Sequence, residues 1–126
     1  MKRLILIALA LVFSAAAQQA KEHWLLIFQL APGIDLAHLT PEQSAVLLEH
    51  RKYVSTLYAK GLVMGGHTNE PVNTLAIAVL ACDEATAKAA VADDPASRAG
   101  YLKGAVHPFV LMPPAPASER EPPVKR

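Results

Sequence analysis

His50 and Asp94 are the residues of this sequence best suited to acid–base chemistry. An imidazole with its ordinary pKa of about 6.5 both accepts and releases protons near neutral pH. His50 is the single polar group within an apolar helical face, whose other members are Val46, Leu47, Val54, Leu57 and Tyr58. Asp94, in an Asp-Pro turn further along the chain, offers a carboxylate that would fix the tautomer of that imidazole. We therefore expect the two side chains to meet and to act as a general acid and base.

Both residues also have purely structural interpretations. A histidine on an apolar helical face is often held by packing, with its nitrogens bonded to backbone or water. Asp94 is suited to capping a short helical turn, because Pro95 follows it and Gly100 closes the segment. These roles are compatible, since one carboxylate oxygen can cap the turn while the other faces an imidazole.

Three further residues are candidates for the wall of a pocket beside this pair. Tyr53 falls at the edge of the same helical face, where core packing is the alternative. Gly66 ends a predicted short strand at a pair of glycines, which allow a sharp turn and leave room near a pocket mouth. His67 comes next and is either a second polar group of the pocket or an exposed loop histidine.

The sequence argues against several other chemistries. No two histidines stand at i,i+2 in a predicted strand or i,i+4 in a predicted helix, and the one cysteine, Cys82, is distant from all of them, so we expect no metal site. No serine lies in a nucleophile-elbow motif. Twelve basic residues balance 11 acidic ones without forming a basic stripe, which disfavours nucleic-acid binding. We expect a small-molecule ligand and no cofactor.

Hydrophobic patterning predicts six elements that position these residues. Strands are expected over residues 24–30, 62–64, 74–81 and 105–112, and helices over residues 41–60 and 84–92. Thr40, Pro41 and Gln43 form a capping box for the first helix, and Gly61 ends it. Pro108 within the last strand indicates a sheet edge.

This β-α-β-β-α-β order is typical of a ferredoxin-like α+β fold, a four-stranded antiparallel sheet with two helices on one face. Apolar residues point to both sides of the strands over residues 25–30 and 75–80. We therefore expect a second copy of the chain to cover the other sheet face, which predicts a homodimer.

The two ends of the chain are expected to lie outside this domain. Residues 1–17 read as a signal peptide, with Lys2 and Arg3 before a ten-residue apolar run and small residues before the cleavage site. That run is too short to span a membrane, which takes about 20 residues. The predicted product is exported, periplasmic or secreted, and not membrane-bound after cleavage. Residues 18–112 form the domain, and residues 113–126 a proline-rich, disordered tail.

Three stretches in this order, Glu49–Leu57, Gly61–Gly66 and Asp94–Gly100, together with the closing His107-Pro108-Phe109, resemble the YCII-related family of the dimeric α/β-barrel group. The resemblance covers residues 23–112. It implies a ferredoxin-like homodimer with a pocket between helices and sheet, and His50 with Asp94 as the active-site pair.

One relative in this group looks like a dehydrochlorinase, and the neighbouring muconolactone isomerases work by cofactor-free proton transfer. The resemblance therefore implies a lyase or isomerase-like enzyme acting on a small organic molecule, in which His50 transfers a proton and Asp94 orients the ring. The alternative is a non-catalytic exported module that binds a small ligand or a partner chain, with the His50–Asp94 hydrogen bond kept for structure.

Overall fold

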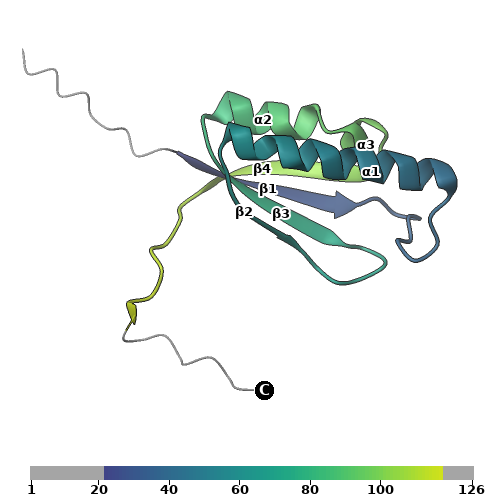
Figure 1. Ribbon diagram of the computed structural model, residues 1–126, viewed down its shortest axis with the longest axis horizontal. Coiled ribbons are helices and arrows are strands. Elements are labelled where there is room, and N and C mark those ends of the chain that lie inside the picture. Colours follow the sequence, from purple (N-terminus) through teal and green to yellow (C-terminus); the bar gives the residue numbers. More distant parts are fainter. Residues whose placement is uncertain (1–21, 118–126) are drawn as a thin grey trace, which may run out of the picture.

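The computed structural model describes residues 22–117 (Figure 1). In chain order its elements are β1 (His23–Leu30), α1 (Pro41–Thr56), the 3₁₀ helix η1 (Leu57–Lys60), β2 (Leu62–His67), β3 (Leu75–Ala81), α2 (Glu84–Ala92), α3 (Pro95–Arg98) and β4 (Leu102–Phe109). The predicted signal peptide, residues 1–17, lies outside the described residues, as do residues 118–126 of the predicted tail. Within the described range, no helix is long and apolar enough to cross a membrane.

The four strands form one antiparallel sheet in the order β2-β3-β1-β4. Figure 1 shows α1, α2 and α3 together on one side of this sheet, with no described helix on the other side. The predicted α+β arrangement is therefore confirmed, and it is compatible with a ferredoxin-like fold. As predicted, β1 is an interior strand and β4, which contains Pro108, lies at an edge.

Two strand boundaries differ from those predicted. The last strand was expected at residues 105–112, but β4 runs from Leu102 to Phe109, because it pairs with β1 over the full length of β1 and ends where β1 begins. The short strand expected at residues 62–64 continues as β2 to His67, because both glycines pair with β3 and carry the ladder on. His67 consequently belongs to the sheet.

The first helix begins as its sequence predicts. The Thr40 hydroxyl accepts from the Gln43 backbone N–H at 3.1 Å, and the Gln43 side chain accepts from the Thr40 N–H at 3.0 Å. Its end tightens into η1, which stops at Gly61 with φ of +105°. A side chain at Gly61 would collide with the Ala81 carbonyl, since a Cβ there would lie 2.2 Å from that oxygen.

The hydrophobic core lies between the sheet and the helices η1 and α2. Its buried members are Leu26, Phe28, Leu57, Ala78, Leu80, Ala87 and Ala90. The small side chains of α2 let it lie close to the sheet, and Gly104 of β4 makes room for Val91, whose Cγ1 would be 2.3 Å from a Cβ at that position. Cys82, expected to be a small buried hydrophobe, is partly buried and packs against this core.

The apolar face of α1 points toward the sheet as predicted, but its residues are only partly buried. Val46, Leu47, His50 and Val54 are half-buried, and no residue of α1 is fully buried. Tyr58, predicted on the same face, is 71% exposed. Tyr58 lies in η1, beyond the end of α1, where the 3₁₀ winding no longer follows the α-helical period. The open packing beneath α1 leaves space between this helix and the sheet.

Candidate active site

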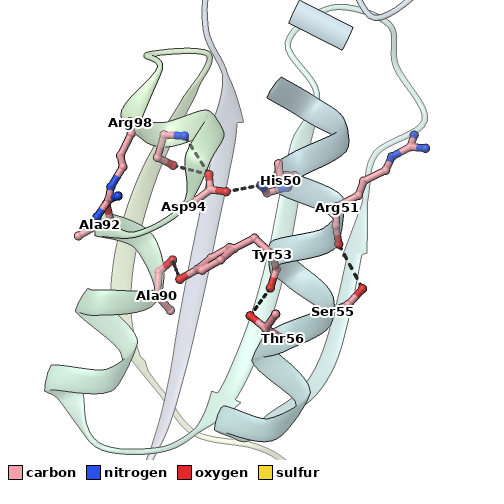
Figure 2. Close-up of polar contacts among 10 residues, drawn as sticks. His50, Arg51, Tyr53, Ser55, Thr56, Ala90, Ala92, Asp94 and Arg98 are labelled. Atoms are coloured by element: carbon pink, nitrogen blue, oxygen red, sulfur yellow. Dashed lines mark hydrogen bonds and ion pairs between the residues drawn. The ribbon is translucent and has the colours of Figure 1, made fainter. Parts of the chain in front are cut away.

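His50 and Asp94 meet as the sequence predicts. His50 Nδ1 lies 2.6 Å from Asp94 Oδ1, a contact that joins α1 to the residue capping α3 (Figure 2). The Asp94 side chain is completely buried, and that of His50 is 16% exposed. Asp94 is therefore shielded from solvent, whereas part of the His50 ring is accessible.

The second oxygen of Asp94 holds the short helix α3. Asp94 Oδ2 accepts from the Ser97 backbone N–H at 2.9 Å and from the Ser97 hydroxyl at 2.8 Å. Burial by itself would raise the pKa of Asp94, but the hydrogen bonds from His50 and Ser97 outweigh it and leave that pKa below its ordinary value. Asp94 is consequently an ionised carboxylate at neutral pH, capping α3 with one oxygen and bonding the imidazole with the other.

The charge of Asp94 decides which nitrogen of His50 carries a proton. An ionised carboxylate only accepts hydrogen bonds, so Nδ1 of His50 must be the donor. In the neutral ring Nε2 is then the basic nitrogen. No described residue is hydrogen-bonded to Nε2. Phe28 packs edge-on against the ring at a centroid distance of 5.8 Å and helps to fix its plane.

A cavity of about 520 Å³ opens beside His50, between α1 and the sheet. Its volume lies within the range of small-molecule sites. Its polar members are His50, Arg51, Tyr58, His67 and Thr74. The remaining lining residues are Phe28, Leu30, Leu36, Leu47, Val54, Leu57, Leu62, Gly65, Gly66, Ala76, Ile77, Ala78 and Leu102. The wall is therefore mostly apolar, with a basic imidazole on one side.

The structure brings together four of the five residues singled out from the sequence. His50, Gly66 and His67 line the cavity, and Asp94 lies behind His50. Tyr53 is not among the lining residues and packs against the core, which was the alternative considered for it. Its hydroxyl instead donates to the Ala90 carbonyl at 2.8 Å, as Figure 2 shows, which ties α1 to α2. Burial, followed by the nearby carboxylates, raises the pKa of Tyr53 and keeps this phenol a donor.

His67 is oriented by its own backbone neighbour. Its Nδ1 lies 2.9 Å from the carbonyl oxygen of Thr68, and since a carbonyl only accepts, Nδ1 carries the proton. His67 reaches the cavity from β2, opposite His50 on α1. The cavity thus has one histidine on its helical wall and another on its sheet wall.

Two residues at the candidate site were not singled out from the sequence. Ser97 fixes Asp94, and its place three residues after an N-cap was a usable signal. Arg51 lines the cavity, and its sequence signal was the lack of a nearby partner, whereas Lys52 has Glu49 one helical turn earlier.

Among the described residues, no group of three or more His, Cys, Asp or Glu side chains could hold a metal ion. Comparison of the chain with models of known protein families gave no match. Comparison with curated proteins gave no match either. What the protein does is therefore inferred from its own side chains.

Proposed function

We propose that this protein is a cofactor-independent acid–base enzyme, of the lyase or isomerase type, acting on a small organic molecule. One observation carries the proposal: an ionised, buried carboxylate holds Nδ1 of His50, which leaves Nε2 as the basic nitrogen of a ring that lines a largely apolar cavity. A closed core around the ring would have favoured a structural histidine. The open cavity favours a base that meets a ligand.

In the proposed reaction, Nε2 of His50 takes a proton from a carbon of the ligand. The electrons of the broken C–H bond move into an adjacent unsaturated group, or expel a leaving group from the neighbouring carbon. The imidazolium that forms is stabilised by Asp94 at 2.6 Å. Return of the proton to another carbon completes an isomerisation, and loss of the leaving group completes an elimination. Positioned proton transfer of this kind accelerates a reaction by about 10²- to 10⁴-fold.

The proposal extends to family, assembly and location. Membership of the YCII-related family fits the α+β fold and the His50–Asp94 geometry. A homodimer that forms a dimeric α/β barrel would cover the sheet face opposite the helices, where Met64 is 50% exposed and Leu75 38% exposed. Export of the protein follows from its N-terminal sequence alone. Sedimentation of the purified protein tests the dimer, and fractionation of expressing cells tests export.

Deuterium exchange tests the proposed chemistry without a known substrate. A panel of small carbon acids, such as cyclic enones and unsaturated lactones, is incubated with the protein in D₂O, and loss of C–H signals is followed by NMR. We expect catalysed exchange that is lost in His50→Gln, because an amide still donates to Asp94 but is no base. His38→Gln is the control, since His38 forms a similar 2.8 Å pair with Asp35 but is exposed and outside the cavity. Exchange that persists in His50→Gln would contradict the assignment.

The non-catalytic alternative draws support from a different observation. Asp94 is needed by α3 whether or not it serves His50, because it accepts both hydrogen bonds from Ser97. A binding module would show a large loss of melting temperature in both His50→Ala and Asp94→Ala, without pH-dependent ligand binding. An enzyme would keep the fold in His50→Gln while losing exchange.

A further inference from the structure

The charges around the cavity indicate what kind of molecule enters it. Arg51 is the one permanently charged side chain among the described residues of its wall, and no Asp or Glu belongs to that wall. We infer that the ligand is a small organic carboxylate with an apolar body, and that the guanidinium of Arg51 binds its carboxylate. This inference rests on the proposed function, since it names the class of molecule on which His50 acts.

Arg51 differs from the other basic residues of α1, α2 and α3 in having no acidic partner. Lys52 pairs with Glu49 at 2.7 Å, Lys88 with Glu84 at 2.6 Å, and Arg98 with Asp93 at 2.9 Å. No ion pair or side-chain hydrogen bond of Arg51 is found within residues 22–117. Figure 2 shows its side chain directed away from both His50 and Asp94. Its guanidinium is consequently available to a ligand.

The cavity wall should bind an anionic ligand in preference to a cationic one. An anion that leaves water for an apolar cavity needs a paired cation, and a guanidinium offers a carboxylate two parallel hydrogen bonds. A cationic ligand would meet Arg51 without a compensating carboxylate. Asp94 cannot serve, because it is buried behind His50 and already accepts three hydrogen bonds.

The other polar groups facing the cavity are compatible with an anion. His67 keeps its Nδ1 proton on the Thr68 carbonyl, so protonation at Nε2 would add a second positive charge on the sheet side. Tyr58 and Thr74 carry neutral hydroxyls, and that of Thr74 is bonded to the Glu70 carbonyl. No group on the described wall opposes negative charge.

A matched pair of probes tests the inference. 2-Naphthoate and 2-naphthamide share shape and apolar body and differ in charge, and binding is followed by the ¹⁵N shifts of the His50 ring. The variants are Arg51→Met, which keeps an unbranched stem without the charge, Arg51→Lys, which keeps the charge, and Lys52→Met. Lys52 is the matched control because it lies on the same helix, is paired with Glu49, and is not part of the cavity wall.

We expect the wild-type protein to prefer naphthoate over naphthamide, and Arg51→Met to weaken naphthoate binding about tenfold, equivalent to about 1.4 kcal/mol. Naphthamide binding should change less than about twofold, as should both affinities in Lys52→Met. Arg51→Lys should retain part of the preference. Arg51 is exposed, so its replacement should leave the fold intact, and the fluorescence of the single tryptophan, Trp24, reports whether each variant is folded.

Two results would overturn the inference. If both probes shift the His50 ring equally well, or if Arg51→Met and Lys52→Met weaken naphthoate binding to the same extent, Arg51 does not select an anion, while the proposed function stands. If neither probe shifts the His50 nitrogens of the wild-type protein, the cavity does not bind such carboxylates and the inference fails, while the deuterium-exchange assay still decides the proposed function.

Discussion

Replacing Asp94 by Asn tests whether this carboxylate sets the tautomer of His50. The amide oxygen can still accept from the Ser97 N–H and hydroxyl, so the cap of α3 is kept in neutral form. The amide nitrogen is then left facing Nδ1 of His50, where the carboxylate accepted at 2.6 Å. Since an NH₂ group donates, Nδ1 must become the acceptor and the proton must move to Nε2. The variant should therefore retain its fold and lose its base.

The energetic cost follows from the hydrogen bonds. A charge-assisted hydrogen bond contributes about 1.5 to 3 kcal/mol and a neutral one about 0.5 to 1.5, so Asp94→Asn should lower the free energy of unfolding by about 1 to 2 kcal/mol at pH 7. Asp94→Ala removes the partner altogether and should cost about 3 to 5 kcal/mol. The same tautomer error in a serine-protease triad lowers turnover about 10⁴-fold, and a loss of that order is expected for proton transfer by His50.

The stability difference should depend on pH in one direction. Because the folded-state pKa of Asp94 lies below its unfolded value, the carboxylate stabilises the fold above the unfolded pKa of about 3.9. That stabilisation is lost as the pH falls through the folded-state pKa, because below it Asp94 is protonated in both the folded and the unfolded chain. The wild-type and Asp94→Asn proteins should therefore converge in stability in strong acid.

Urea unfolding at pH 7 and pH 3, with ¹⁵N NMR of the imidazole, measures these effects. Asp93→Asn is the control, because Asp93 is an exposed carboxylate paired with Arg98 that makes no hydrogen bond to His50. The reasoning is refuted if Asp94→Asn matches Asp93→Asn in stability at both pH values. It is equally refuted if Nε2 of His50 stays unprotonated in the neutral ring of Asp94→Asn.

Two packing predictions accompany this one. Gly104→Ala should lower the free energy of unfolding by about 1 to 3 kcal/mol, because its Cβ would overlap Val91. Adding Val91→Ala should recover part of this loss in the same urea titration. A double variant no more stable than Gly104→Ala would show that the contact is not the cause. Tyr53→Phe should cost about 0.5 to 1.5 kcal/mol through loss of the hydrogen bond to Ala90, and unchanged deuterium exchange would agree with its place outside the cavity.

The parts of the fold that were predictable are those whose residues act locally. Thr40 with Gln43, and Asp83 with Thr86, cap their helices through bonds between neighbours in sequence. The limits of β4 depend instead on the strand beside it, and single-sequence patterns do not contain that register. Strand ends were accordingly misplaced by three residues, although the order of elements was predicted.

The candidate site shows the same division. His50 was identifiable because a polar group interrupts an apolar face, and Asp94 because an Asp-Pro turn favours a cap. Their contact joins residues 44 positions apart, so the pairing could be proposed from the chemistry of the two side chains but not from local pattern. Tyr53 was left between core and pocket wall, and Arg51 was not singled out, because helical periodicity gives the direction of a side chain but not where packing stops and a cavity begins.

The two oxygens of Asp94 couple the tautomer of His50 to the folding of α3, because one oxygen bonds the imidazole and the other caps this helix. Opening of α3 releases Ser97 from one oxygen and exposes the carboxylate to water, so the bond that holds Nδ1 of His50 weakens at the same moment. The ring can then exchange its proton between its two nitrogens. Fraying of the four-residue helix α3, which packs against α1, would therefore disable the base while the sheet and α1 remain folded.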